Sequence, residues 1–327
     1  LLDDAVSDAE LSPDRMYRKP EGGELPREAH HSMRSAFRET EKSTRSDPPA
    51  DGRAAQKHTK EMEESRAAVR AAQRDLSELA RTGKLGAVVG RDKEIDHVIE
   101  VLMRRRKPNV ILVAEPGVGK SALIEGLAAR LVSDRCPDED LAKRAVREVS
   151  LTSMVAGSRF RGDFESRMGM LISESEKDRA ILFIDEIHML MGSGAVSRGG
   201  MDGANILKPA LARDGLSLIG ATTPDEAMLL REDRALMRRF EIIYLDEPGR
   251  AQMSQILESA EDAFLTDHKV RIYPRIRNRP LDFGERYLSH RRKPDPSSDL
   301  LALAAVSARW NGTDGTSELT HERPAVR

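Results

Sequence analysis

Short apolar runs alternate with longer amphipathic stretches through the middle of the chain. Four runs are bounded by turn residues and have the length of single strands, at residues 110–113, 181–184, 216–219 and 242–245. Apolar positions recur with helical spacing between or beside these runs, in residues 93–105, 121–132, 164–175 and 206–212. Because strands that alternate with helices build parallel sheets, the pattern predicts an α/β fold with a parallel sheet covered by helices.

The N-terminal part of the chain lacks this alternation. Residues 1–52 are rich in Ser, Pro, Asp, Glu and Arg and have almost no apolar periodicity. Such a segment buries too little apolar surface to offset its ordering entropy, so we expect a disordered polar tail. A weak apolar stripe follows, at Met62, Val69, Leu76 and Leu79. This stripe predicts a lead-in helix over residues 53–82. A solvated helix is the favoured interpretation, and a helix that packs on the folded core or binds a partner is the alternative.

The C-terminal part is helical in pattern but less regular. Residues 83–248 hold the α/β pattern, and we expect residues 249–310 to form a small helical subdomain. Prolines interrupt this second segment, at Pro274, Pro280, Pro294 and Pro296. Since proline disfavours a helix interior, we expect the helical subdomain to be degraded. Residues 311–327 are predicted to be a C-terminal tail.

Composition narrows the class of protein. The 327 residues suggest about two folded units, at roughly 150 residues per unit. A net charge of −2 provides no global basic field that would attract nucleic acid or anionic lipid. Cys136 is the only cysteine, which excludes a disulfide within the chain and favours a reducing, cytoplasmic environment. No stretch approaches the ~20 apolar residues of a membrane span, so we expect no membrane association.

The strongest single motif is a glycine-rich loop between an apolar strand and a helix. Its residues are Ala114, Glu115, Pro116, Gly117, Val118, Gly119, Lys120 and Ser121. This is the P-loop pattern with alanine at the first glycine position, and a glycine-rich turn without a ligand is the alternative. In a P-loop, backbone N–H groups and a helix N-terminus point at phosphate oxygens. Lys120 would contact the β and γ phosphates and Ser121 would bind Mg²⁺, so the motif predicts ATP and Mg²⁺ as cofactors.

Two acidic residues follow the second apolar run directly. Asp185 and Glu186 come after the strand predicted at residues 181–184, where a parallel sheet faces its ligand crevice. Asp185 would orient the Mg²⁺ shell, and Glu186 would accept a proton from the attacking water. The alternative, a solvated acidic turn, is disfavoured by the P-loop upstream. We interpret the nearby His188 as structural.

Six ordered segments together resemble the first ATPase module of the Clp family of AAA+ unfoldases. They are LARTGKLGAVVGRDKEIDHVIEVLMRRRKPN, AEPGVGKS, GSRFRGDFESRM, ILFIDEIH, GATTPDE and DRALMRRF. The resemblance covers roughly residues 79–309. It implies the AAA+ P-loop NTPase fold with a helical lid over residues 249–310, ATP hydrolysis, and a homo-hexameric ring. It also implies protein substrates, which such a chaperone remodels or unfolds.

The resemblance implies roles for further residues. Val88 and Val89 resemble the segment that packs on the adenine, and Thr222 resembles the polar sensor that helps to place the attacking water. Arg238 and Arg239 resemble arginine fingers that reach the γ-phosphate on a neighbouring subunit. A guanidinium fork matches phosphate oxygens and neutralises the charge that develops during transfer, which suits that role.

Phe160 resembles the aromatic residue of a pore loop that grips a translocating polypeptide. It stands between Arg159 and Arg161 in a glycine-flanked segment. An aromatic ring can contact many side chains without selecting among them. Stacking on nucleic-acid bases is the chemical alternative, since Arg and Phe also suit bases. The glycine-rich residues 192–200 resemble a second pore loop.

Three departures from the family pattern limit what the resemblance implies. Within residues 1–327 we expect neither an N-terminal adaptor-binding domain nor a second ATPase module with its protease-docking loop. The predicted lid is irregular, with Pro296 where the family has a lysine. The sequence therefore predicts a single-module AAA+ ATPase that remodels or unfolds proteins. An ATP-switched regulatory or assembly protein without threading is one alternative. A nucleic-acid remodelling ATPase is another, against which the absence of a recognisable nucleic-acid-binding motif counts.

Overall fold

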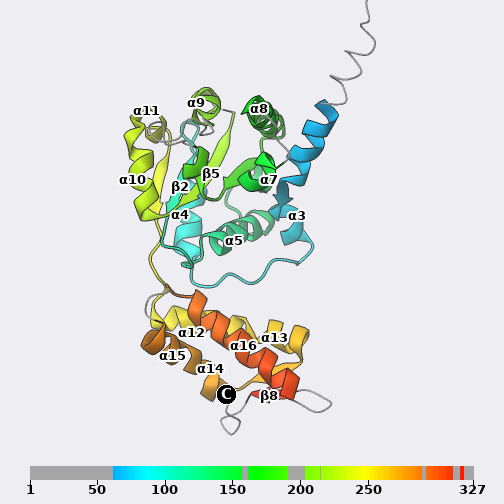
Figure 1. Ribbon diagram of the computed structural model, residues 1–327, viewed down its shortest axis with the longest axis vertical. Coiled ribbons are helices and arrows are strands. Elements are labelled where there is room, and N and C mark those ends of the chain that lie inside the picture. Colours follow the sequence, from blue (N-terminus) through cyan, green and yellow to red (C-terminus); the bar gives the residue numbers. More distant parts are fainter. Residues whose placement is uncertain are drawn as a thin grey trace, which may run out of the picture. The chain divides into compact units, whose positions relative to one another are not determined.

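The computed structural model of the protein describes residues 62–156, 161–190, 203–213, 215–288, 292–311 and 317–319 (Figure 1). All of them lie within one compact unit that begins at Lys60. Within this unit, residues up to β6 build an α/β part, and the following residues build a smaller and mainly helical part. None of the helices in the described ranges is long and apolar enough to cross a lipid bilayer.

A six-stranded sheet lies at the centre of the α/β part. Its strands, in spatial order, are β1 (Gln73–Asp75), β3 (Val146–Val149), β4 (Ile181–Ile184), β5 (Ser217–Thr222), β2 (Val110–Val113) and β6 (Glu241–Tyr244). Every pairing is parallel except that of the edge strand β1, which runs antiparallel to β3. All residues of β2, β4 and β5 are buried, as expected for parallel strands covered on both faces. The predicted α/β fold with a helix-covered parallel sheet is confirmed.

Helices cover both faces of this sheet. One face carries α3 (Leu76–Arg81), α4 (Asp92–Leu102), α5 (Lys120–Val132) and α6 (Glu139–Ala142). The other carries α7 (Leu151–Val155), α8 (Arg161–Asp178), the short helix η2 (Ile187–Leu190), α9 (Ala204–Ala212), α10 (Pro224–Glu232) and α11 (Arg234–Met237). Figure 1 shows α8 and α9 on one side of the strands and α5 on the other.

The alternation of side chains along each strand explains this double cover. Successive residues of a strand point to opposite faces. In β2, Val110 and Leu112 pack with the apolar residues of α4 and α5. Ile111 and Val113 pack instead with the apolar residues of α8 and α9. A strand that is apolar at every position therefore joins two separate hydrophobic cores.

The segment before the sheet differs from the single solvated helix predicted over residues 53–82. Residues 62–71 are helical, but Gln73–Asp75 then form strand β1, and the Asp75 side chain caps the separate helix α3. Val69 and Leu76 are fully buried, on opposite faces of the sheet. The prediction of a continuous, solvated helix is wrong because the edge of β3 offers hydrogen-bonding partners that residues 73–75 satisfy as a strand.

Helices also dominate the C-terminal part. Its elements are α12 (Arg250–Ser259), α13 (Glu261–His268), β7 (Val270–Ile272), α14 (Pro274–Arg277), α15 (Arg279–Tyr287), α16 (Asp295–Asn311) and β8 (Ser317–Leu319), with β7 parallel to β8. They enclose their own apolar core, formed by Met253, Leu257, Ile272, Ile276, Leu281 and Leu301.

The prolines of this part do not break its helices. Pro274 and Pro280 stand in the first turns of α14 and α15, and Pro296 is the second residue of α16. A proline is tolerated there because the N–H group that it lacks has no partner within the helix. These prolines therefore begin helices in the described residues, and the interruption expected near Pro280 lies between α14 and α15.

Candidate nucleotide-binding site

The glycine-rich loop connects the central strand β2 to the N-terminus of α5. Gly117 and Gly119 adopt φ angles of 81° and 102°, in the left-handed region that L side chains rarely enter. Gly119 is also the N-cap of α5 and has no side chain that could cap the helix. The N–H groups of the first helical turn therefore receive no side-chain cap from residue 119, as at helix N-termini that bind anions.

Lys120 is held over this loop by the backbone of the loop itself. Its ammonium group donates to the carbonyl oxygens of Ala114 at 2.9 Å and of Glu115 at 3.4 Å. An ammonium has three donors, so these contacts leave one for a phosphate oxygen. Ser121, in the first turn of α5, is exposed, as is Pro116, whereas Val118 is buried and anchors the loop in the core beneath it.

Three strand ends bring the predicted site residues to one edge of the sheet. Val113 of β2 pairs with Thr222 of β5, and the N–H of Ala114 donates to the Thr222 carbonyl at 3.1 Å. On the other side of β5, Ile184 of β4 pairs with Gly220. The start of the loop, Thr222 and the acidic pair after Ile184 therefore share the carboxyl edge of the sheet.

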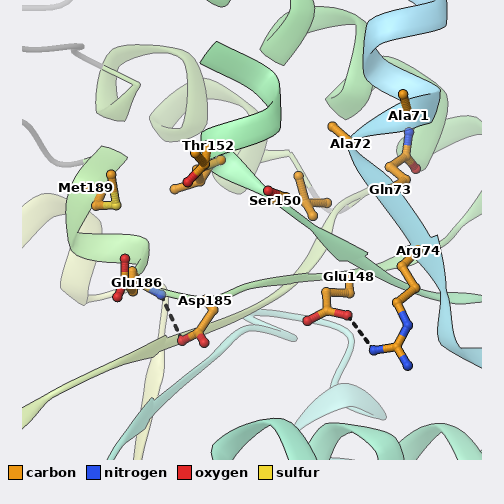
Figure 2. A pocket seen from close by; sticks show the side chains of 12 residues that line it. Ala71, Ala72, Gln73, Arg74, Glu148, Ser150, Thr152, Asp185, Glu186 and Met189 are labelled. Atoms are coloured by element: carbon orange, nitrogen blue, oxygen red, sulfur yellow. Dashed lines mark hydrogen bonds and ion pairs between the residues drawn. The ribbon is translucent and has the colours of Figure 1, made fainter. Parts of the chain in front are cut away.

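The acidic pair is exposed and lines a cavity of about 450 Å³. The backbone N–H of Glu186 donates to Asp185 Oδ1 at 2.9 Å. Glu186 has a φ of 50°, an uncommon and strained conformation for a residue other than glycine, which is typical of functional positions. Figure 2 places this pair on one side of the cavity and the ion pair between Arg74 and Glu148, 3.2 Å long, on the other.

Thr222 makes contacts that the sequence did not predict. Its side chain is buried, and its hydroxyl donates to Glu226 Oε2 at 3.2 Å. His188 Nδ1 lies 3.2 Å from the same hydroxyl and 3.0 Å from Glu226 Oε2. Burial alone would raise the pKa of Glu226, but hydrogen bonds from Thr223 and Thr222 and the attraction of His188 outweigh it, so this pKa lies below its usual range. The interpretation of His188 as structural does not include this contact with Thr222.

Arg238 and Arg239 lie at the opposite edge of the sheet from the loop. They precede Glu241, where the parallel strand β6 begins, and the side chain of Asn109, just before β2, donates to the Arg239 carbonyl at 3.2 Å. The guanidinium of Arg239 donates to the Ala235 carbonyl at 2.8 Å, in the helix α11 that ends shortly before it. Because a four-residue strand spans roughly 13 Å, these arginines are not brought to the loop of their own chain.

The remaining predicted residues fall into two groups. Val88 and Val89 are half-buried, and Val88 packs so closely on α5 that a methyl group at Gly126 would lie 3.1 Å from Val88 Cβ. Arg161 begins α8. The rest of the predicted pore loops, residues 157–160 with Arg159 and Phe160 and residues 192–200, lies outside the described residues.

Asp295, the first residue of α16, approaches the loop from the helical part. A methyl group built on Gly117 would lie 2.8 Å from Asp295 Oδ2. Asp295 is not among the site residues that the sequence predicts. A carboxylate in a proline-rich segment carries no signal of its own, and only the fold brings it to the loop.

Comparisons with known proteins agree with the fold and with the position of the loop. A family model described as the ATPase family associated with various cellular activities (AAA) matches residues 110–247. The chaperone protein ClpB of Aquifex aeolicus is 45% identical over 234 residues, which cover 71% of this chain and 23% of that protein. The heat shock protein 104 of Schizosaccharomyces pombe is 44% identical over 238 residues, which cover 72% of this chain and 26% of that protein.

Solved structures give the same result. A closed-state reconstruction of Hsp104 with ATPγS and FITC casein matches with a TM-score of 0.67 and 40% identity, over 74% of this chain and 41% of that one. The S. cerevisiae Hsp104–ADP complex matches with a TM-score of 0.67 and 39% identity, over 74% of this chain and 34% of that one. The chain thus spans about a quarter of the length of the curated relatives it matches.

Proposed function

We propose that this chain, which belongs to the Clp-type AAA+ ATPases, binds ATP with Mg²⁺ at residues 114–121 and hydrolyses it to drive the remodelling of protein substrates. One observation carries the ATPase proposal. The ends of β2, β4 and β5 bring a phosphate loop, an acidic pair and a buried threonine hydroxyl to one edge of the sheet. Each of these groups suits a different part of phosphoryl transfer to water.

The residues present suit a magnesium ion. The Ser121 hydroxyl and the Asp185 carboxylate are both exposed oxygen ligands at the carboxyl edge, and Mg²⁺ takes few protein ligands beside phosphate and water. When bound, the ion would neutralise charge on the β and γ phosphates. Lys120 would add a further positive charge from above the loop.

Glu186 and Thr222 are proposed to act on the attacking water. The Glu186 carboxylate is exposed and would take one proton from the water as a general base. The Thr222 hydroxyl already donates its hydrogen to Glu226, so its oxygen would accept a hydrogen bond from the same water. These two acceptors would orient the water toward the γ-phosphate.

A second copy of the chain is proposed to complete the site. Arg238 and Arg239 lie at the amino edge of the sheet, away from the loop of their own chain, and Arg238 is exposed. Arginine fingers at that edge would reach the γ-phosphate of a neighbour in a ring, for which we propose a homo-hexamer. Such a finger is worth ~10³–10⁵ in rate.

Protein substrates are the favoured targets of this ring. The support is the similarity to Hsp104, which has been solved with casein, and the aromatic Phe160 between two arginines. The irregular lid was the main reason to consider an ATP-switched protein without threading. The apolar core that Met253, Leu257, Ile272, Ile276, Leu281 and Leu301 form in this part counts against that alternative. A cytoplasmic location, favoured by the lone Cys136, belongs to the same proposal.

Calorimetric titration with ATP and Mg²⁺ tests the binding step. We expect the parent chain to bind and Lys120→Ala to show no measurable binding. Lys177→Ala, which removes an exposed lysine from the end of α8, is the matched control and should bind like the parent. Equal affinities of the parent and Lys120→Ala would contradict the assignment of the phosphate loop.

A further inference from the structure

Arg91 connects the phosphate loop to the segment that leads into the helical part. Its side chain is buried, and its Nη2 donates to the carbonyl oxygens of Val118 and of Asp246, each at 2.9 Å. Nη1 of the same guanidinium donates to Glu94 Oε1 at 2.9 Å. One side chain therefore holds the loop, the connection between β6 and α12, and the first turn of α4.

The residue before Arg91 makes a second contact with the helical part. Gln252 of α12 donates through Nε2 to the Gly90 carbonyl at 3.1 Å, while its Oε1 accepts from the N–H of Gly249 at 3.0 Å. Gly90 has a φ of +78°, and a methyl group built on it would lie 3.4 Å from Gln252 Cγ. The Gln252 side chain is thus fixed at both ends, between residue 90 and the start of its own helix.

The chemistry of the Arg91 contacts indicates positioning and not phosphate binding. The Glu94 carboxylate neutralises the charge of Arg91, and the Nη2 group of Arg91 donates to two backbone carbonyls. A planar guanidinium has donors in fixed directions, so it constrains its acceptors relative to one another, which a flexible ammonium does not. Val118 is buried, so the loss of Arg91 would deprive its carbonyl oxygen of this donor.

We propose that Arg91 and Gln252 form a coupling latch through which the phosphate loop sets the position of the helical part. The inference rests on the proposed nucleotide site. A nucleotide that shifts the Val118 carbonyl shifts the shared guanidinium and, with it, the Asp246 carbonyl. The shift then reaches α12 through residues 246–249 and through the contact between Gln252 and Gly90. Arg91 is accordingly a positioning residue that transmits occupancy of the loop.

Distance measurements between spin labels on the two parts test this latch. Cysteines replace Met228 on α10 and Trp310 on α16, which are 64% and 88% exposed, in a Cys136→Ser background. We expect the distance distribution of the otherwise unchanged chain to shift when ATPγS and Mg²⁺ are added. In Arg91→Ala and in Gln252→Ala, we expect that shift to be lost, while calorimetry shows ATP affinity within about three-fold of the parent.

Two further variants separate coupling from folding and from binding. Arg91→Lys keeps a buried positive charge but lacks the planar guanidinium, so it should lose the shift in the distance distribution. This variant tests the proposal even if Arg91→Ala fails to fold. Arg130→Ala is the matched control, because Arg130 joins α5 to α4 through Asp92 and Asp96 and should keep the shift. A full shift in Arg91→Lys and Gln252→Ala would overturn the latch, as would a parent that binds nucleotide without any shift. A parent that binds no nucleotide by calorimetry would overturn the proposed function together with the latch.

Discussion

His188 Nδ1 lies 3.2 Å from the hydroxyl oxygen of Thr222, the buried residue at the end of the strand beside the acidic pair. The same nitrogen lies 3.0 Å from Glu226 Oε2. An ionised carboxylate only accepts hydrogen bonds, so this geometry assigns the ring hydrogen to Nδ1. His188 and Glu226 together fix the rotation of the Thr222 hydroxyl and leave its oxygen as an acceptor.

Replacing His188 should therefore slow turnover without weakening binding. The Thr222 hydroxyl in His188→Ala loses one partner worth about 1 kcal/mol, and we expect ATP turnover to fall about five-fold. His188→Asn, whose amide N–H can take the place of Nδ1–H, should recover most of that loss. Steady-state hydrolysis with calorimetry checks this, with His97→Ala as the control on the other edge of the sheet. Equal turnover of His188→Ala and the parent would show that the Thr222 hydroxyl does not need the contact with His188.

Glu226 makes the stability of this region depend on pH. Its pKa in the folded chain lies below the ordinary value of 4.5, so the folded state favours the carboxylate more than the unfolded state does. The stabilisation is complete above the unfolded pKa and is lost as the pH falls through the folded pKa. We expect Glu226→Gln to cost about 1 kcal/mol in urea unfolding at pH 7, through the weakened hydrogen bonds to Thr222 and Thr223. The difference should shrink steadily below pH 4.5, and a difference that is constant down to pH 3 would contradict this explanation.

The position of Arg238 and Arg239 at the amino edge predicts that they act on the nucleotide site of a neighbouring copy of the chain. If Arg239 acts on a neighbour, turnover per subunit should rise with protein concentration. Subunits with Arg239→Ala and subunits with Glu186→Gln should both be inactive alone but regain activity when mixed, since some interfaces then pair an intact Glu186 with an intact arginine. Hydrolysis assays and native mass measurement on the mixtures test whether the arginine of one subunit acts in the site of another. A monomer with a rate independent of concentration would exclude catalysis in trans.

Phe160 distinguishes the possible targets of the ATPase. We expect unfolded casein to stimulate hydrolysis by the parent but not by Phe160→Ala, because an apolar ring contacts many sequences and a methyl group does not. Basal hydrolysis should be unchanged in that variant. Stimulation by single-stranded DNA that weakens steeply with salt would instead favour the nucleic-acid alternative. A lack of stimulation by either polymer would favour the ATP-switched alternative.

The sequence predicts those parts of the site whose chemistry demands particular residues close together in the chain. Gly117, Gly119 and Lys120 are recognisable because one loop supplies both the backbone conformation and the charge. The apolar strands β2 and β4 are recognisable because both of their faces are buried. For such elements the local sequence pattern directly reflects the surroundings of the residues in the folded protein.

Other elements are set by distant partners and leave no local pattern. β3 was not predicted, since Arg147 and Glu148 occupy its half-buried middle. The contact of His188 with Thr222 joins residues 34 positions apart, and that of Arg91 with Asp246 joins residues 155 apart. The fold alone creates these contacts, so spacing along the chain could not reveal them.

Hydrolysis of bound ATP by Glu186→Gln is the decisive test of whether this site is an ATPase site with Glu186 as its base. The substitution keeps the volume of the side chain but removes the general base, so we predict that Mg²⁺-dependent turnover falls on the order of 10²-fold or more while calorimetry still shows ATP binding. Glu148→Gln is the matched control, because it removes a carboxylate from the same cavity that is paired with Arg74. We expect near-parent turnover for this control. Undiminished turnover in Glu186→Gln, with ATP bound, would contradict the assignment of Glu186 as the base and with it the proposed mechanism.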